Sequence, residues 1–110
     1  MSLEHTRQPL NGTPKLRTAF VGGGYTSAAG RLHRTALEMD QRYTLVAGCF
    51  SRHPAANRAS ALEYGIAPER AYGSFEELLA AEAGNIDVIV ILTPTDQHKA
   101  QVLRCLDAGI

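Results

Sequence analysis

The feature that most constrains the fold of this 110-residue chain is a nearly continuous apolar run, IDVIVILT, at residues 86–93. Both faces of such a run avoid water, which is typical of a strand in a parallel sheet that helices cover on both sides. Two shorter apolar runs, at residues 16–21 and 43–51, predict further strands, and residues 70–73 predict a very short one. The chain therefore supplies the strands of a small buried sheet.

Helical stretches alternate with these strands. They are predicted, in chain order, at residues 26–42, 54–64, 74–84 and 95–108. The third has the capping-box spacing of Ser74 and Glu77, and the last has Thr95 or Asp96 as its candidate N-cap. Strands that alternate with helices predict an α/β fold, here a Rossmann-like, doubly wound parallel sheet.

Three consecutive glycines, Gly22 to Gly24, lie between the first predicted strand and the first predicted helix. Gly22 and Gly24 form the G-x-G half of a dinucleotide-binding motif, in which glycines allow a tight turn and a close approach of a pyrophosphate. The place of the third glycine is taken by Ser27, and the next glycine, Gly30, comes three residues later. A glycine-rich turn without any ligand therefore remains an alternative.

Hydroxyl groups follow the glycines. Tyr25, Thr26 and Ser27 could donate hydrogen bonds to a phosphate at the N-terminus of the first helix, where free N–H groups favour anions. Any of the three could equally be a simple helix cap.

The end of the second strand, residues 49–53, lacks the acidic residue with which an NAD site usually binds the ribose 2′-hydroxyl. Ser51 and Arg52 are instead suited to a 2′-phosphate, which would favour NADP. The alternative is that Arg52 is one more solvated surface arginine. A methyltransferase that uses S-adenosylmethionine has a similar glycine loop, but the missing acid also disfavours that class.

A third group of candidates follows the fourth strand, at the end of the sheet where open α/β folds bind ligands. Pro94 ends the strand, and Thr93 and Thr95 offer hydroxyls. His98 falls in the first turn of the next helix, whose positive end favours a neutral ring. A purely structural histidine is the alternative there.

Composition excludes several classes of protein. Eleven basic residues balance eleven acidic ones, which argues against partners such as nucleic acid or a membrane surface. The chain has no apolar run long enough for a membrane helix and no signal peptide. Cys49 and Cys105 are isolated in the sequence, which indicates two reduced, buried thiols in a cytoplasmic protein. No group of His, Cys, Asp and Glu residues has the spacing of metal ligands. Residues 1–15 are expected to form a flexible arm and residues 16–110 one domain.

Taken together, these stretches resemble the Gfo/Idh/MocA oxidoreductases. Residues 21–34 are similar to the family's glycine loop, lengthened by three residues, and residues 43–66 to its second strand and helix. The most specific match is residues 86–110, which resemble the family's D-x-V-x-I-x-T-P-x-x-x-H segment.

The resemblance implies a domain that binds NAD or NADP, in an enzyme that transfers hydride to or from a small-molecule substrate, a sugar, polyol or sugar derivative. The implied cofactor-binding residues are Gly22, Gly24, Tyr25, Thr26, Ser27, Ser51, Arg52, Thr93, Pro94, Thr95 and His98. It implies no catalytic residue here, because the family's catalytic groups would lie beyond residue 110, with a second α/β domain through which a homo-oligomer forms. A non-catalytic NAD(P)-binding regulator and an NAD-dependent glycosidase relative remain alternatives.

Overall fold

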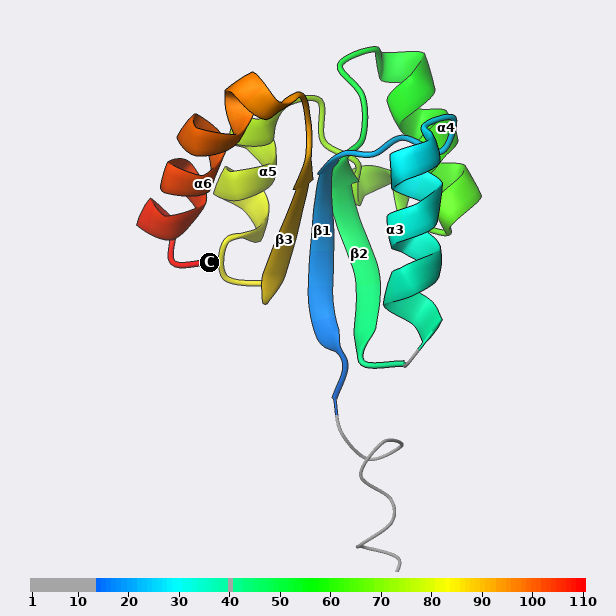
Figure 1. Ribbon diagram of the computed structural model, residues 1–110, viewed down its shortest axis with the longest axis horizontal. Helices are drawn as coiled ribbons and strands as arrows, with labels where there is room; N and C mark the ends of the chain where they lie inside the picture. The colour runs from blue at the N-terminus through cyan, green and yellow to red at the C-terminus, as the bar shows by residue number, and fades with distance from the viewer. Residues whose placement is uncertain (1–13, 40) are drawn as a thin grey trace, which may run out of the picture.

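The computed structural model describes residues 14–39 and 41–110 and contains a parallel three-stranded sheet with helices on both faces (Figure 1). In chain order the elements are β1 Leu16–Gly22, α3 Ala28–Met39, β2 Tyr43–Cys49, α4 Pro54–Tyr64, the 3₁₀ turn η1 Pro68–Arg70, α5 Phe75–Glu82, β3 Val88–Leu92, the 3₁₀ turn η2 Thr95–Gln97 and α6 His98–Asp107. The α/β, Rossmann-like prediction is confirmed. The arm expected over residues 1–15 lies outside the described residues, apart from residues 14 and 15.

The strand order is β2-β1-β3, so the first strand of the chain is the middle of the sheet. Phe20 of β1 is in register with Gly48 of β2 on one side and with Val90 of β3 on the other. All three strands are parallel, so their carboxyl ends meet at one end of the sheet. That end carries the segments from which the sequence predicts a binding site.

Alternate residues of β1 face two separate hydrophobic clusters, as the pleat of a strand requires. On the side of α3 and α4, Phe20, Phe50 and Tyr64 meet edge to face with ring centroids 5.4 to 6.4 Å apart, a favourable aromatic geometry. On the side of α5, Ala19 and Val21 pack with a second set of buried residues. Figure 1 shows α3 and α4 on one side of the sheet and α5 and α6 on the other.

Most helix boundaries follow the sequence signals. α4 begins at Pro54 and ends at Tyr64 as predicted, and Gly65 closes it in the left-handed region, with φ +72°. Ser74 caps α5 as predicted, because its hydroxyl accepts a hydrogen bond from the N–H of Glu77 at 3.1 Å. The first predicted helix is shorter than expected, since α3 covers only Ala28–Met39.

Two local predictions are wrong. The short strand expected at residues 70–73 is reduced to a single bridge between Ala71 and Gly48, because the chain turns into α5 directly afterwards. Neither Thr95 nor Asp96 caps α6, since both lie within the 3₁₀ turn η2 that precedes it.

The strand β3 is one of the two edges of the sheet, and its five residues are half-buried rather than buried on both faces. Helix α6 follows it and exposes Val102, Leu103 and Leu106. In the part of the chain that the structure describes, no helix is both long and apolar enough to cross a membrane.

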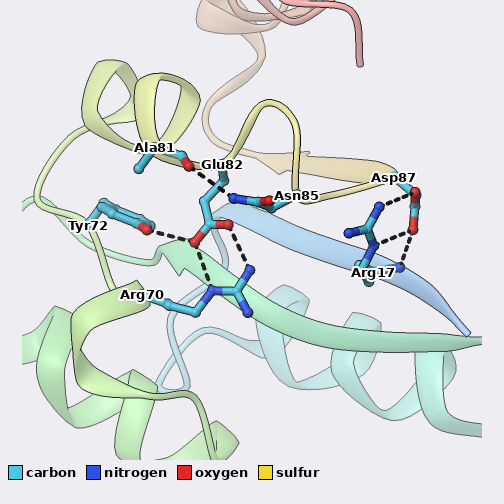
Figure 2. A network of polar contacts seen from close by, with 7 residues as sticks. All are labelled: Arg17, Arg70, Tyr72, Ala81, Glu82, Asn85 and Asp87. Atoms are coloured by element: carbon cyan, nitrogen blue, oxygen red, sulfur yellow. Dashed lines mark hydrogen bonds and ion pairs between the residues drawn. The ribbon is translucent and has the colours of Figure 1, made fainter.

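A carboxylate–guanidinium pair joins the starts of β1 and β3 (Figure 2). Asp87 accepts hydrogen bonds from the backbone N–H of Arg17 at 2.8 Å, from its Nε at 3.0 Å and from its Nη2 at 2.9 Å. The hydrogen bonds from the Arg17 side chain, and next that from its backbone, lower the pKa of Asp87 to about 2.

A second polar cluster holds α5 against the loop before it. Glu82 is almost completely buried and accepts two hydrogen bonds from the Arg70 guanidinium, at 2.7 and 2.8 Å, and one from the Tyr72 hydroxyl at 2.6 Å (Figure 2). The Arg70 hydrogen bonds are the main reason that the pKa of Glu82 is lowered. Burial, followed by the hydrogen bond to Glu82, raises the pKa of Tyr72 to about 12.

Candidate functional site

The glycine turn at the end of β1 requires glycine for two different reasons. Gly22 and Gly23 have φ values of +81° and +73°, in the left-handed region that side chains disfavour. A Cβ on Gly23 would also lie 2.6 Å from the side chain of Leu92. Glycine is therefore required at both positions by the left-handed backbone conformation and by the close approach of β3.

Gly30, in the first turn of α3, permits a close approach of the helix to this turn. A Cβ on Gly30 would lie 2.1 Å from the carbonyl oxygen of Gly23 and 2.6 Å from that of Gly24. This is the helix–strand packing that the third glycine of a dinucleotide-binding motif allows. The motif is therefore complete in space, although three extra residues separate its parts in the sequence.

Helix α4 fixes the turn from the other side. The Tyr64 hydroxyl donates a hydrogen bond to the carbonyl oxygen of Gly23 at 2.9 Å, and the Ser60 hydroxyl accepts one from the N–H of Tyr25 at 3.0 Å. Tyr64 and Ser60 are both buried. The backbone of the turn is thus held by side chains rather than left free to adapt.

Ser27 caps α3. Its hydroxyl accepts a hydrogen bond from the N–H of Gly30 at 3.1 Å, and its carbonyl accepts one from Arg31. The N–H groups of Ala28 and Ala29, just before these, have no acceptor among the described residues. This helix end therefore offers free donors and a partial positive charge to an anion.

A cavity of about 580 Å³ lies at the carboxyl ends of the three strands. Its walls are the ends of β1 and β2, residues 73–75 at the start of α5, and residues 92–94 at the end of β3, together with Gln97 and Gln101. A second hollow of about 380 Å³ lies between the glycine turn and α4. The two share Phe50, Ser51 and Leu92, so they form neighbouring parts of one depression.

Nine of the eleven predicted cofactor-binding residues line this depression. The larger cavity is lined by Gly22, Ser51, Arg52, Thr93 and Pro94, and the smaller by Gly24, Tyr25, Thr26, Ser27 and again Ser51. Thr95 and His98 line neither.

His98 is turned toward the backbone directly after β3, and it lines neither cavity. Its Nε2 lies 2.5 Å from the carbonyl oxygen of Thr93, so Nε2 carries the proton and donates it. The Thr93 hydroxyl in turn lies 2.5 Å from Oε1 of Gln101. His98 and Gln101 together fix the segment that follows β3.

Arg52 lies exposed at the rim of the larger cavity. No hydrogen bond or ion pair joins its side chain to another described residue, so its charge remains available to a ligand. Cys49 lines the same cavity, but it is buried, and burial raises the pKa of its thiol. Cys49 and Cys105 are free thiols, as predicted.

The sequence prediction missed several residues of this region. Residues 73–75, Gln97 and Gln101 line the larger cavity, and no ligand-binding motif singles them out, although Ser74 was predicted as a helix cap. Asn57 is buried on α4 and bonded to the end of β2. Its signal in the sequence is an amide in the first turns of an alanine-rich helix, a position where asparagine is unfavourable unless its side chain is bonded.

The chain is similar to known proteins over the whole of this fold. Residues 16–110 match the family model GFO_IDH_MocA, described as an oxidoreductase family with an NAD-binding Rossmann fold. An uncharacterized oxidoreductase of Bacillus subtilis, YfiI, is 33% identical over an alignment of 99 residues, which covers 86% of this chain and 25% of that protein.

Two solved structures carry the comparison further. An inositol dehydrogenase homolog from Azotobacter vinelandii, complexed with NADH and myo-inositol, is 35% identical with a TM-score of 0.83, over 89% of this chain and 27% of that one. The WlbA dehydrogenase from Bordetella pertussis, in complex with NADH and UDP-GlcNAcA, is 30% identical with a TM-score of 0.67, over 87% of this chain and 27% of that one. The chain thus spans about a quarter of the length of these relatives.

Proposed function

Because this chain belongs to the Gfo/Idh/MocA oxidoreductase family and is an NAD-binding Rossmann domain, we propose that it is the cofactor-binding part of a dehydrogenase that acts on a sugar, polyol or sugar derivative. The observation that carries this proposal is the approach of Gly30 to the Gly23 carbonyl. That contact brings the free N–H groups of α3 to the glycine turn, next to a cavity at the carboxyl ends of the strands.

The pyrophosphate is proposed to bind at this turn. Gly22 and Gly24 would admit it to the backbone, and Tyr25, Thr26 and Ser27 would offer hydroxyl donors beside the amides of α3. Ser27 keeps this capacity although it caps the helix, because its oxygen accepts from Gly30 while its proton stays free to donate.

The two ends of the dinucleotide are proposed to lie on either side of the turn. Ser51 and Arg52 would face the adenosine ribose, and Arg52 would bind a 2′-phosphate if one is present. Thr93 and Pro94 would wall the nicotinamide side, supported by Thr95 and His98, of which His98 acts by holding the Thr93 carbonyl.

The bound dinucleotide supplies the hydride chemistry, and the residues described here would bind and orient it. The relatives indicate the class of substrate, since one was solved with myo-inositol and another with UDP-GlcNAcA. Both ligands carry hydroxyl groups on ring carbons. We therefore expect a secondary alcohol on a ring as the group that exchanges hydride with the cofactor. None of the described residues is proposed as catalytic.

A calorimetric titration of the full-length protein with NADH, NADPH and S-adenosylmethionine tests the proposal. Binding of at least one nicotinamide dinucleotide and none of S-adenosylmethionine is expected. Reduction of NAD or NADP in the presence of myo-inositol and a panel of sugars and polyols would then identify the substrate. If neither nicotinamide cofactor binds, the glycines are only a turn and the proposal is wrong.

A further inference from the structure

We propose that Asn57 is a positioning residue for the adenosine end of the dinucleotide, because it fixes the backbone turn at Phe50 and Ser51. This inference rests on the proposed function. Asn57 lies on α4, is 4% exposed and touches neither cavity itself. It therefore acts through the residues that it holds.

The side-chain oxygen of Asn57 accepts two backbone hydrogen bonds from the end of β2. One comes from the N–H of Phe50 at 2.8 Å and the other from the N–H of Ser51 at 3.3 Å. Both donors lie where the chain leaves the sheet, beyond the last strand residue Cys49. Without Asn57 the N–H of Phe50, a residue only 3% exposed, would be buried with no acceptor.

The same turn lines both hollows of the candidate site. Phe50 and Ser51 belong to the larger cavity and to the smaller one beside the glycine turn. The Ser51 hydroxyl accepts a hydrogen bond from the N–H of His53 at 3.1 Å, so its proton is free to donate to a ligand oxygen. Asn57 thus sets the direction of a donor that faces the ribose.

Asn57 also reaches the opposite wall of the larger cavity. Its Nδ2 donates to the carbonyl oxygen of Tyr72 at 2.9 Å, directly before the lining residues 73–75. The Tyr72 N–H donates to the Gly48 carbonyl at 2.8 Å, and its hydroxyl donates to Glu82. One amide therefore holds both walls at a fixed spacing, and the Glu82 cluster anchors the second wall.

The test compares Asn57→Ala and Asn57→Asp in the full-length protein, with Asn85→Ala as the matched control. Asn85 is an exposed asparagine whose side chain donates a hydrogen bond to the Ala81 carbonyl and also interacts with Glu82, but no hydrogen bond joins it to Phe50, Ser51 or Tyr72. The probes are NADH, AMP, which carries the adenosine end, and nicotinamide mononucleotide, which lacks it. Thermal unfolding of each variant reports its stability separately.

Asn57→Ala is expected to weaken the binding of AMP and of NADH about tenfold, because a hydrogen-bonded contact to the ligand is misplaced. The affinity for nicotinamide mononucleotide should stay within twofold of that of the wild type. Asn57→Asp keeps the acceptor for both amides but loses the Nδ2 donor to the Tyr72 carbonyl, so its AMP affinity should lie between those of wild type and Asn57→Ala. Asn85→Ala should bind all three ligands as the wild type does.

Three results overturn the inference. If Asn57→Ala lowers thermal stability but binds AMP as the wild type does, Asn57 is merely structural and the proposed function survives. If AMP and nicotinamide mononucleotide weaken equally, the loss is a general collapse of the site. If the wild type binds no nicotinamide dinucleotide, both proposals fail. Should the alanine variant not fold, Asn57→Ser, whose short side chain cannot hold both amides, carries the same comparison.

Discussion

Gly30 of α3 lies so close to Gly23 that a Cβ added to Gly30 would stand 2.1 Å from the Gly23 carbonyl oxygen. A real Cβ cannot occupy that position, and the obstructing atom belongs to backbone rather than to a flexible side chain. The contact couples the start of α3 to the glycine turn, so the helix end and the turn move as one unit.

The variant Gly30→Ala should therefore destabilise the protein by about 3 kcal/mol, toward the upper end of overpacking costs, and weaken binding of nicotinamide dinucleotides. Denaturant unfolding and calorimetry measure the two effects. Gly84→Ala is the control, because a Cβ there would meet no atom within 4 Å. Wild-type behaviour of Gly30→Ala would show that the helix can shift without cost.

Removal of the Tyr64 hydroxyl should loosen the glycine turn. Tyr64→Phe leaves the ring cluster intact but deprives the buried Gly23 carbonyl of its hydrogen bond, which should cost about 1–2 kcal/mol of unfolding free energy. Urea unfolding measures the loss. Tyr43→Phe is the matched control, since no described residue is bonded to the Tyr43 hydroxyl. Equal stabilities of the two variants would contradict a holding role for Tyr64.

Loss of the Arg52 charge should affect only the phosphorylated cofactor. Arg52→Ala is expected to weaken the binding of NADPH about tenfold, which is the scale of one charge-assisted contact at an exposed site. Its affinity for NADH should stay within twofold of that of the wild type. Arg58→Ala, which removes an exposed arginine of α4 away from both hollows, is the control. An equal effect of Arg52→Ala on NADH and NADPH would exclude the 2′-phosphate role.

The Arg17–Asp87 pair should make stability fall in acid. The folded-state pKa of Asp87 is lowered from 3.8 to about 2, so its contribution is complete above about pH 4 and is lost as the pH falls toward 2. Asp87→Asn should show a smaller drop in melting temperature between pH 6 and pH 2.5 than the wild type. Asp96→Asn, with no such partner, should keep the wild-type drop. Identical profiles for all three proteins would contradict the assignment.

Much of the fold could be predicted from the sequence, because its signals are local. Apolar runs indicated β1, β2 and β3, and Pro54 and Gly65 bounded α4. The edge strand was less buried than its apolar run suggested, because strand order depends on contacts between distant segments. The 3₁₀ start of the last helix was missed because residue types alone do not distinguish a 3₁₀ turn from the first turn of an α-helix.

The sequence predicted which segments form the site, but it did not predict the directions of their side chains. The carboxyl ends of parallel strands meet at one edge, so Ser51 and Thr93 could be expected near the glycines. The direction of His98 could not be predicted, because it depends on a hydrogen bond to the Thr93 carbonyl. Asn57 was missed because its partners are backbone groups, so that its only signal in the sequence is an amide at an unfavourable place in a helix.

The central position of β1 has a consequence for how the protein is made. β1 is synthesised before β3, and the Arg17–Asp87 hydrogen bonds that join the two strands form only after Asp87, 70 residues later, has been added. At synthesis rates of roughly 5–20 residues per second, the side of β1 that pairs with β3 stays without its partner for about 4–14 seconds. During that interval the nascent chain presents β1 as a temporary edge, open to pairing with other chains.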